Sequence, residues 1–321
     1  MNPIGQSNRP AAGVDRRTLL RHSAFAIPAA ALAVRGLPTA RAANALGVPP
    51  PSAPPPDESG YASVNGLEMY YEVRGSGDPV ILLHGGLTTI DLQFGALLGP
   101  LSADRQVIGA ELQAHGHTAD IDRPMSFEAM ADDVAGLIEH LGLERVDIFG
   151  YSLGGGVAMQ TAIRHPELVR KLVVASTVIR LDGWYPEVLA GMQQMKPESA
   201  EAMQGLPFYE AYVQVAPRPE DWPTLIGKVG QLTTTEYDWT ADLETITAPT
   251  LLVMGDSDSV RPEHAVEIFR LLGGGVPGDF GALPASQLDV LPGTAHSTVT
   301  YRVDLLMATV PAFLDTPMPA P

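Results

Sequence analysis

The stretch GYSLG at residues 150–154 constrains this chain more than any other feature. An apolar run at 146–149 precedes it, and a run of small residues at 155–162 with a helical pattern follows it. In such a strand, turn and helix context, the turn is so tight that the positions two residues before and after the serine must be glycine. The turn also aims backbone N–H groups and a helix N-terminus at the serine hydroxyl. The stretch therefore predicts that Ser152 is a nucleophile; the alternative is a turn that needs glycine for its shape alone.

A serine hydroxyl is a weak nucleophile without a base, and the base needs a third group to hold its tautomer. The apolar run at 249–254 predicts a buried strand, and Asp256 and Asp258 follow it. The run at 286–291 predicts the last strand, and a loop that contains His296 comes next. Serine, acid and histidine thus occur in the order expected for this kind of turn. Either carboxylate could instead cap the helix that follows.

Four short motifs occur in order along the chain: HGG at 84–86, GYSLG at 150–154, GDSD at 255–258 and GTAH at 293–296. With these motifs the chain resembles the α/β-hydrolase superfamily, in the branch of esterases, cofactor-free haloperoxidases and ring-cleavage-product hydrolases. The resemblance spans residues 60–315.

The resemblance implies a role for each residue of the expected triad. Ser152 would be the nucleophile, and His296 would take its proton and later return it to the leaving group. Asp258 stands at the acidic position of the GDSD motif and would orient His296, with Asp256 as the competitor.

The resemblance also implies an oxyanion hole, built from two backbone N–H groups. One would belong to Leu153, the residue after the nucleophile, and the other to Gly86, with Leu87 as the next choice. The alternative for the HGG motif is an ordinary turn at the end of a strand. We expect His84 itself to be structural and bonded to backbone.

Strand-like and helix-like patterns alternate along most of the chain, which predicts an α/β fold: a mostly parallel sheet with helices on both faces. We expect an antiparallel edge strand at 67–73 and a strand buried on both faces at 80–83. The elements expected next are a strand at 106–110, a helix from Ser126 to His140, a strand at 145–149, a helix at 153–164 and a strand at 171–175.

The alternation stops between residues 179 and 248, a span that is rich in methionine and aromatic residues. It resembles the helical cap that α/β-hydrolases insert after strand 6. Any one apolar residue here is best explained by packing, but together they imply an apolar acyl or alcohol pocket. The residues that we expect to line this pocket are Leu87, Tyr151, Trp184, Met192, Met195 and Tyr209.

The amino terminus has the features of an export signal. The pair Arg16-Arg17, an apolar run at 24–34 and an A-x-A pattern at 40–42 resemble a twin-arginine signal peptide. We expect passage through the Tat machinery, cleavage after Ala42, a periplasmic or secreted protein and no stable membrane anchor after cleavage. The alternatives are a cytoplasmic protein with a disordered basic tail and an uncleaved anchor.

The expected organisation therefore has six parts. These are the signal peptide (1–42), a Pro-rich linker (43–59), the first part of the α/β-hydrolase core (60–178), the helical cap (179–248), the second part of the core (249–315) and a tail (316–321).

Composition limits the partners of this chain. Its formal net charge of −17 over 321 residues argues against nucleic acid and anionic membrane surfaces. The chain has no cysteine, which excludes disulfides and thiolate zinc sites. His115 and His117 stand two residues apart, but no nearby cysteine or acid in the sequence completes a ligand set. We expect neither a metal nor a cofactor.

These observations leave four hypotheses. The first is hydrolysis of a small, fairly apolar carboxylic ester or lactone through an acyl-enzyme. The second is a cofactor-free perhydrolase or haloperoxidase with the same triad, which the motifs do not separate from the first. The third is a carbon–carbon bond hydrolase, and the fourth a non-catalytic ligand-binding protein. Serine rather than aspartate at position 152 argues against haloalkane dehalogenase and epoxide hydrolase chemistry.

Overall fold

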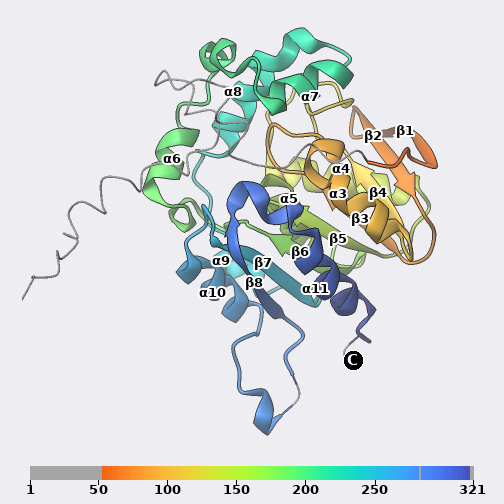
Figure 1. The fold of residues 1–321 in the computed structure, drawn as a ribbon, viewed down its shortest axis with the longest axis vertical. Coiled ribbons are helices and arrows are strands. Elements are labelled where there is room, and N and C mark those ends of the chain that lie inside the picture. Colours follow the sequence, from red (N-terminus) through yellow and green to blue (C-terminus); the bar gives the residue numbers. More distant parts are fainter. Residues whose placement is uncertain (1–52, 282, 319–321) are drawn as a thin grey trace, which may run out of the picture.

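A single eight-stranded sheet forms the centre of the computed structural model, which describes residues 53–281 and 283–318. The expected signal peptide lies outside the described residues. The strand order is β1-β2-β4-β3-β5-β6-β7-β8 (Figure 1). The strands are β1 (Glu58–Val64), β2 (Leu67–Arg74), β3 (Pro79–Leu83), β4 (Gln106–Ala110), β5 (Val146–Tyr151), β6 (Val169–Ala175), β7 (Thr250–Ser257) and β8 (Gln287–Ala295). Strand β1 pairs antiparallel with β2, and β2 with β4, while all the other pairs are parallel.

Helices cover both faces of the sheet, which confirms the α/β class expected from the alternation. They are α3 (Ile90–Ser102), α4 (Phe127–His140), α5 (Leu153–Arg164), α10 (Pro262–Leu271) and α11 (Val303–Asp315). Side chains alternate across a strand, so β3 sends Ile81 and Leu83 into the core under α4 and α5, and Val80 and Leu82 into the core under α3 and α11.

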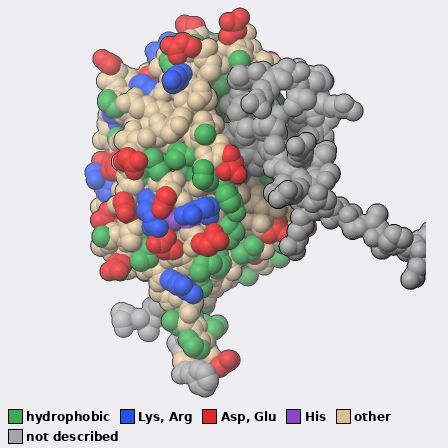
Figure 2. Space-filling view, turned by 90° about the vertical axis from the view of Figure 1, so that its left-hand side faces the viewer, with side chains coloured by type: hydrophobic (Ala, Val, Ile, Leu, Met, Phe, Trp, Pro, Cys, Tyr) green, Lys and Arg blue, Asp and Glu red, His purple; other side chains and the backbone are tan. Residues whose placement is uncertain are grey.

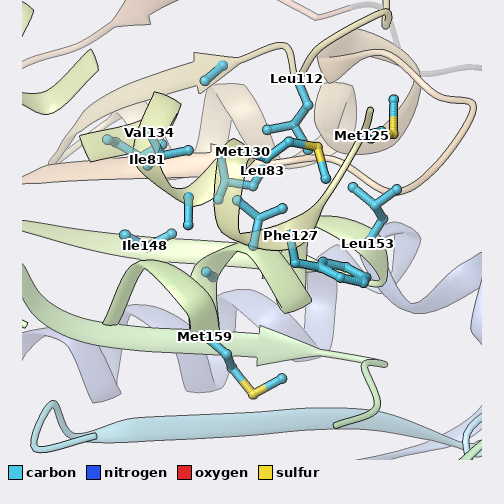
Figure 3. Packing of buried hydrophobic residues seen from close by; sticks show 14 of the residues in the cluster. Ile81, Leu83, Leu112, Met125, Phe127, Met130, Val134, Ile148, Leu153 and Met159 are labelled. Atoms are coloured by element: carbon cyan, nitrogen blue, oxygen red, sulfur yellow. The ribbon is translucent and has the colours of Figure 1, made fainter. Parts of the chain in front are cut away.

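Figure 3 shows the first of these two cores from close by. Residues of α4 and α5 meet the side chains of the central strands there. The labelled members include Ile81, Leu83, Phe127, Met130, Val134, Ile148, Leu153 and Met159. This packing fixes the helix that follows GYSLG against the sheet.

The segment between β6 and β7 is helical, as expected for a cap inserted after strand 6. It contains α6 (Pro186–Met192), α7 (Pro207–Val215), α8 (Trp222–Leu232) and α9 (Thr240–Leu243), with short 3-10 turns between them. In Figure 1, α6, α7 and α8 lie above the sheet in the upper part of the view, and α9 lies beside α10. Lys228 of α8 ties it to the core, because its ammonium donates to the Asp120 carboxylate at 2.8 Å and to the Ile121 carbonyl at 2.9 Å.

The first turn of the cap is joined to the loop after β7 by backbone hydrogen bonds. Trp184 and Val260 form an antiparallel bridge. On either side of it, the Tyr185 N–H donates to the Ser259 carbonyl at 3.2 Å and the Arg261 N–H donates to the Gly183 carbonyl at 2.9 Å. The cap therefore begins with a short two-stranded ribbon against the loop that contains Asp258.

Two expectations about strands were wrong in detail. The expected edge strand at 67–73 is β2, but it lies between β1 and β4 and is not an edge. Strand β1 begins at Glu58, inside the range expected for the linker. The sequence pattern did not predict this strand, because only Ala62 and Val64 of its seven residues are buried and the alternation of buried and exposed residues is too short to recognise.

The surface of the described part is mixed in charge. Figure 2 shows acidic and basic side chains side by side over the face that it presents. A segment between α10 and β8 protrudes from the body and exposes Val276 and Leu283. Within residues 53–281 and 283–318, no helix has both the length and the apolar content that a bilayer crossing requires.

Candidate active site

Ser152 stands at the turn between β5 and α5 in a strained conformation. Its φ is 53° and its ψ is −115°, a combination that L-residues rarely adopt and that costs on the order of 1–3 kcal/mol. The surroundings hold it there: the Ser152 N–H donates to the Ala175 carbonyl at 2.8 Å, and the Thr177 hydroxyl donates to the Ser152 carbonyl. The strain is thus maintained by the end of β6 and the residues that follow it.

The two glycines around Ser152 are required by close backbone approach. A Cβ on Gly150 would collide with the carbonyl of Gly154, and a Cβ on Gly154 would collide with the carbonyl of Leu83. The helix therefore starts almost in contact with the strands, and this leaves Ser152 half-buried at the carboxyl end of β5.

The structure brings Ser152, Asp258 and His296 together, as expected from their order. His296 Nε2 lies 3.2 Å from Ser152 Oγ, and His296 Nδ1 lies 2.8 Å from Asp258 Oδ1. A carboxylate can only accept, so Nδ1 bears the proton and Nε2 is left as an acceptor facing the serine hydroxyl. In this arrangement the imidazole can remove the proton of Ser152.

Asp258 is almost fully buried, yet it remains ionised. Its Oδ2 accepts from the Ser176 hydroxyl at 2.6 Å and from the Gly255 N–H at 3.1 Å, and its Oδ1 accepts from the Val260 N–H at 3.1 Å. Burial alone would raise the pKa of Asp258, but His296 and these donors together hold that pKa below its usual value. Sequence reasoning missed Ser176, which belongs to no motif and simply follows the last residue of β6.

Asp256, the competing acid, faces a different partner. Its carboxylate is exposed and accepts from the N–H groups of Gly293 at 2.9 Å and Thr294 at 3.1 Å. These backbone bonds lower the pKa of Asp256. The side chain therefore braces the loop that leads to His296 and does not meet the imidazole.

Tyr151 lies beneath His296 and is buried. Its hydroxyl donates to the His296 carbonyl at 2.7 Å, and the two rings are 5.2 Å apart. We expected Tyr151 in the substrate pocket, but its polar end is occupied by the backbone of the histidine loop. Trp184 meets the same imidazole from the cap, edge to face, at 5.5 Å.

The backbone donors near Ser152 separate into two kinds. The Leu87 N–H donates to His115 Nε2 at 3.1 Å, which removes Leu87 as an alternative donor for an oxyanion. The N–H groups of Gly86 and Leu153 have no acceptor among the described residues. The two residues are neighbours, since a Cβ on Gly86 would lie 3.6 Å from Leu153 Cδ1. Gly86 therefore lies against the side chain of the residue that follows Ser152, and the N–H groups of both Gly86 and Leu153 are without an acceptor in the described part of the chain.

The other expected pocket residues are distributed between the site and the interior of the cap. Trp184 packs with Val260 in a small buried cluster, and Met192 touches this cluster and the main core. Met195 is buried in the main core, and the ring of Tyr209 packs edge to face on that of Trp222 at 5.6 Å. A residue that we did not expect, Val229 of α8, reaches the loop after β3: a Cβ on Gly86 would lie 3.2 Å from its Cγ1.

His115 and His117, which stand two residues apart in the sequence, lie in different environments. His117 Nδ1 lies 2.9 Å from a carboxylate oxygen of Glu111, an acid that we did not connect with it from the sequence. His115 is fully buried and bonds only to backbone. Among residues 53–281 and 283–318, no three histidine or acidic side chains are grouped so as to hold a metal ion.

Known proteins resemble this chain in family and fold. The profile of the family described as alpha/beta hydrolase fold matches residues 78–299. A non-heme haloperoxidase of Rhodococcus erythropolis is 26% identical over 284 residues, which covers 78% of this chain and 97% of that protein.

Two solved structures are similar in fold alone. A thermophilic esterase from Thermogutta terrifontis superposes with a TM-score of 0.63 at 23% identity, covering 80% of this chain and 98% of that one. The enol-lactonase from Burkholderia xenovorans gives 0.62 at 20% identity, covering 80% and 100%.

Proposed function

The chain belongs to the α/β-hydrolase family, and on that premise we propose that it is a serine hydrolase of small, fairly apolar carboxylic esters or lactones. One observation carries the proposal. The imidazole of His296 lies between the buried carboxylate of Asp258 and the hydroxyl of Ser152, at 2.8 and 3.2 Å. This is the geometry in which a hydroxyl becomes a nucleophile at neutral pH.

The first half of the reaction forms an acyl-enzyme. Ser152 Oγ attacks the ester carbonyl carbon while His296 Nε2 takes the hydroxyl proton. The carbonyl oxygen becomes an oxyanion and accepts from the free N–H groups of Gly86 and Leu153. The intermediate then collapses: the bond to the alcohol oxygen breaks, and His296 gives its proton to that oxygen.

The second half releases the acid. Water enters, His296 takes one of its protons, and the hydroxide attacks the acyl carbon. The second oxyanion is held by the same N–H pair, and its collapse breaks the bond to Ser152 Oγ, which regains a proton from His296. Asp258 stays ionised throughout and stabilises the imidazolium that forms in each half. The mechanism needs neither a metal nor a cofactor.

The side chains around the reacting atoms support an apolar acyl or alcohol group. Trp184 lies against His296, Val229 and the Leu153 side chain lie beside Gly86, and all three are buried. Apolar and aromatic walls with a few fixed polar groups are typical of small-molecule sites.

The direct test uses residues 43–321 and a series of p-nitrophenyl esters of increasing acyl length. We expect hydrolysis with a preference for short or medium chains, covalent labelling of Ser152 by a fluorophosphonate, and loss of both in Ser152→Ala. Equal hydrolysis by wild type and Ser152→Ala would refute the mechanism. A wild-type protein that neither cleaves esters nor reacts with the probe would favour a non-catalytic ligand-binding protein.

A second candidate is perhydrolysis, favoured by the similarity to the Rhodococcus haloperoxidase over nearly its whole length. Hydrogen peroxide would replace water as the attacker of the acyl-enzyme, giving a peracid and free Ser152. Incubation with acetate and peroxide, with detection of peracetic acid, separates the two. Carbon–carbon bond hydrolysis stays a third candidate, and a ring-cleavage product offered as substrate would test it.

We also propose export through the Tat machinery to the periplasm or medium, supported by the sequence at Arg16-Arg17 and 40–42. Replacement of both arginines by lysine should retain the protein in the cytoplasm. Amino-terminal sequencing of the exported protein should begin at Ala43. Equal export of the two forms would contradict the proposal.

A further inference from the structure

Two buried histidines join the loop after β3 to the loop after β4 in a reciprocal way. His84, from the first loop, accepts from the Leu112 N–H of the second at 3.1 Å. His115, from the second loop, accepts from the Leu87 N–H of the first, also at 3.1 Å. The rings are 4.8 Å apart, and neither is exposed. Each loop therefore holds the other through one imidazole.

The hydrogen bonds of both rings fix one neutral tautomer. Nδ1–H of His84 donates to the Gly85 carbonyl at 2.7 Å, and Nδ1–H of His115 donates to the Gln113 carbonyl at 2.9 Å. Each Nε2 must then be the acceptor, because its partner is a backbone N–H. Burial, with the neighbouring His84, lowers the pKa of His115 to about 3, so this ring stays an acceptor at neutral pH.

The same contacts orient the N–H of Gly86. The carbonyl of Gly85 accepts from His84 and from the Thr88 hydroxyl at 3.1 Å. A trans peptide is planar, and its N–H points opposite to its carbonyl. Because the Gly85 carbonyl is held on the side of His84, the Gly86 N–H is turned away from that side and is left without an acceptor in the described part of the chain.

The bond from Leu87 to His115 keeps the next peptide from relaxing. Leu87 has a φ of 63°, in the left-handed region that costs an L-residue about 1–2 kcal/mol. Rotation of the peptide between Gly86 and Leu87 would relieve this strain and reorient the residue that carries the free donor. The His115 acceptor opposes that rotation, since it would leave the Leu87 N–H buried and unpaired.

We propose that His115 is a positioning residue of the oxyanion hole, acting as a neutral acceptor that fixes Leu87 and leaves the Gly86 N–H to the substrate. The inference rests on the proposed function, because it assigns the Gly86 donor to the oxyanion of that reaction. His115 touches neither the substrate nor Ser152 in this account, and it acts only through the backbone of the loop after β3.

The test compares His115→Leu, which removes the acceptor, with His115→Gln, whose amide oxygen can accept from Leu87. His140→Gln, at an exposed position on α4, is the matched control. Loss of one oxyanion donor lowers kcat by about 10²–10³, so we expect His115→Leu to lose about 10- to 100-fold in kcat with KM nearly unchanged. His115→Gln should recover much of the loss.

A ligand pair separates positioning from general damage. A trifluoromethyl ketone adds to Ser152 and forms an oxyanion, whereas the corresponding methyl ketone binds without reacting. In His115→Leu the affinity for the first should fall by the same factor as kcat, and the affinity for the second should stay. Equal losses for both ketones, or an unchanged kcat, would overturn the proposal.

Hydrogen exchange of the Leu87 amide gives an answer that does not depend on catalysis. In ¹⁵N-labelled protein this amide should exchange slowly in wild type and fast in His115→Leu. Equal exchange rates would overturn the proposed role of the Leu87–His115 hydrogen bond even if the enzyme is active. If His115→Leu does not fold, the ¹⁵N shifts of the wild-type His115 ring decide: a proton on Nε2 at neutral pH overturns the assignment, and one on Nδ1 alone supports it. Absent ester cleavage in wild type would instead count against the proposed function.

Discussion

Replacement of Asp258 by asparagine should abolish most of the activity, for a reason that can be followed atom by atom. Oδ2 accepts from two donors, the Ser176 hydroxyl and the Gly255 N–H, while Oδ1 accepts from His296 and the Val260 N–H. In Asp258→Asn a single oxygen remains: at the Oδ2 position it keeps the hydrogen bonds from Ser176 and Gly255, and the NH₂ group at the Oδ1 position leaves the Val260 N–H without an acceptor.

The amide nitrogen of Asp258→Asn then faces His296 and can only donate. Nδ1 must become the acceptor, so the proton of the neutral ring moves to Nε2, and the imidazole can no longer take the proton of Ser152. A wrong tautomer of this kind lowers kcat about 10⁴-fold, which corresponds to about 5 kcal/mol of transition-state stabilisation.

Asp256→Asn is the matched control, with the same chemical change two residues away. Its carboxylate is exposed and accepts from the Gly293 N–H through Oδ2 and from the Thr294 N–H through Oδ1; the single amide oxygen of the variant keeps one of these bonds, and neither of them involves His296. We expect kcat within a few-fold of wild type. Both variants should be assayed with a short p-nitrophenyl ester at neutral pH, with circular dichroism and thermal melting as checks of folding. A folded Asp258→Asn protein within tenfold of wild type, or a larger loss in Asp256→Asn, would refute the reasoning.

Three further outcomes follow from the same contacts. Ser176→Ala removes a 2.6 Å hydrogen bond to the Asp258 carboxylate. Hydrogen bonds to charged groups are worth about 1.5–3 kcal/mol, and with about half of that expressed in the transition state kcat should fall about tenfold. Full activity with an unchanged pH–rate profile would contradict this. In Gly86→Ala the added methyl would lie 3.2 Å from Val229 Cγ1; we expect kcat/KM to fall more for long acyl esters than for acetate, and a uniform loss across the ester series would speak against a pocket wall there. Finally, burial lowers the pKa of His115 from 6.5 to about 3, so between these pH values the unfolded chain binds more protons than the folded one. The free energy of unfolding should therefore drop as the pH falls through that window. Urea titrations between pH 4 and 8 should show a shallower pH dependence of this free energy in His115→Gln than in wild type, and parallel curves would count against a buried neutral imidazole.

The parts of the site that the sequence could predict are those with a strong local cause. Ser152 lies between Gly150 and Gly154, where any side chain would collide with backbone, and this requirement is visible in the five residues GYSLG. The strand before it and the helix after it bury continuous apolar faces, so their patterns are clear. His296 and the two acids were located because each follows an apolar run at the end of a strand.

The parts that could not be predicted depend on contacts between distant segments. Ser176 meets Asp258 across 82 residues, and Tyr151 meets the His296 carbonyl across 145. The first contact joins the ends of the neighbouring strands β6 and β7, and the second joins β5 to the turn after β8, two strands beyond β6 in the sheet, so no local pattern could have found either. The choice of Asp258 over Asp256, by contrast, came from the GDSD motif. In the structure the register between β7 and β8 shifts between Gly255 and Ser257, Asp256 accepts from Gly293 and Thr294, and Asp258 meets His296.

The ribbon that joins Gly183–Tyr185 to Ser259–Arg261 has a practical consequence for engineering. The ribbon begins one residue after Asp258. A chimera that takes a foreign cap from residue 179 onward therefore also replaces the backbone partner of the loop after β7. A graft that starts at Pro186 keeps the native seam, and it should exchange selectivity for acyl groups without disturbing the proton relay. The modular boundary of this hydrolase therefore lies inside its lid, several residues after the sheet ends.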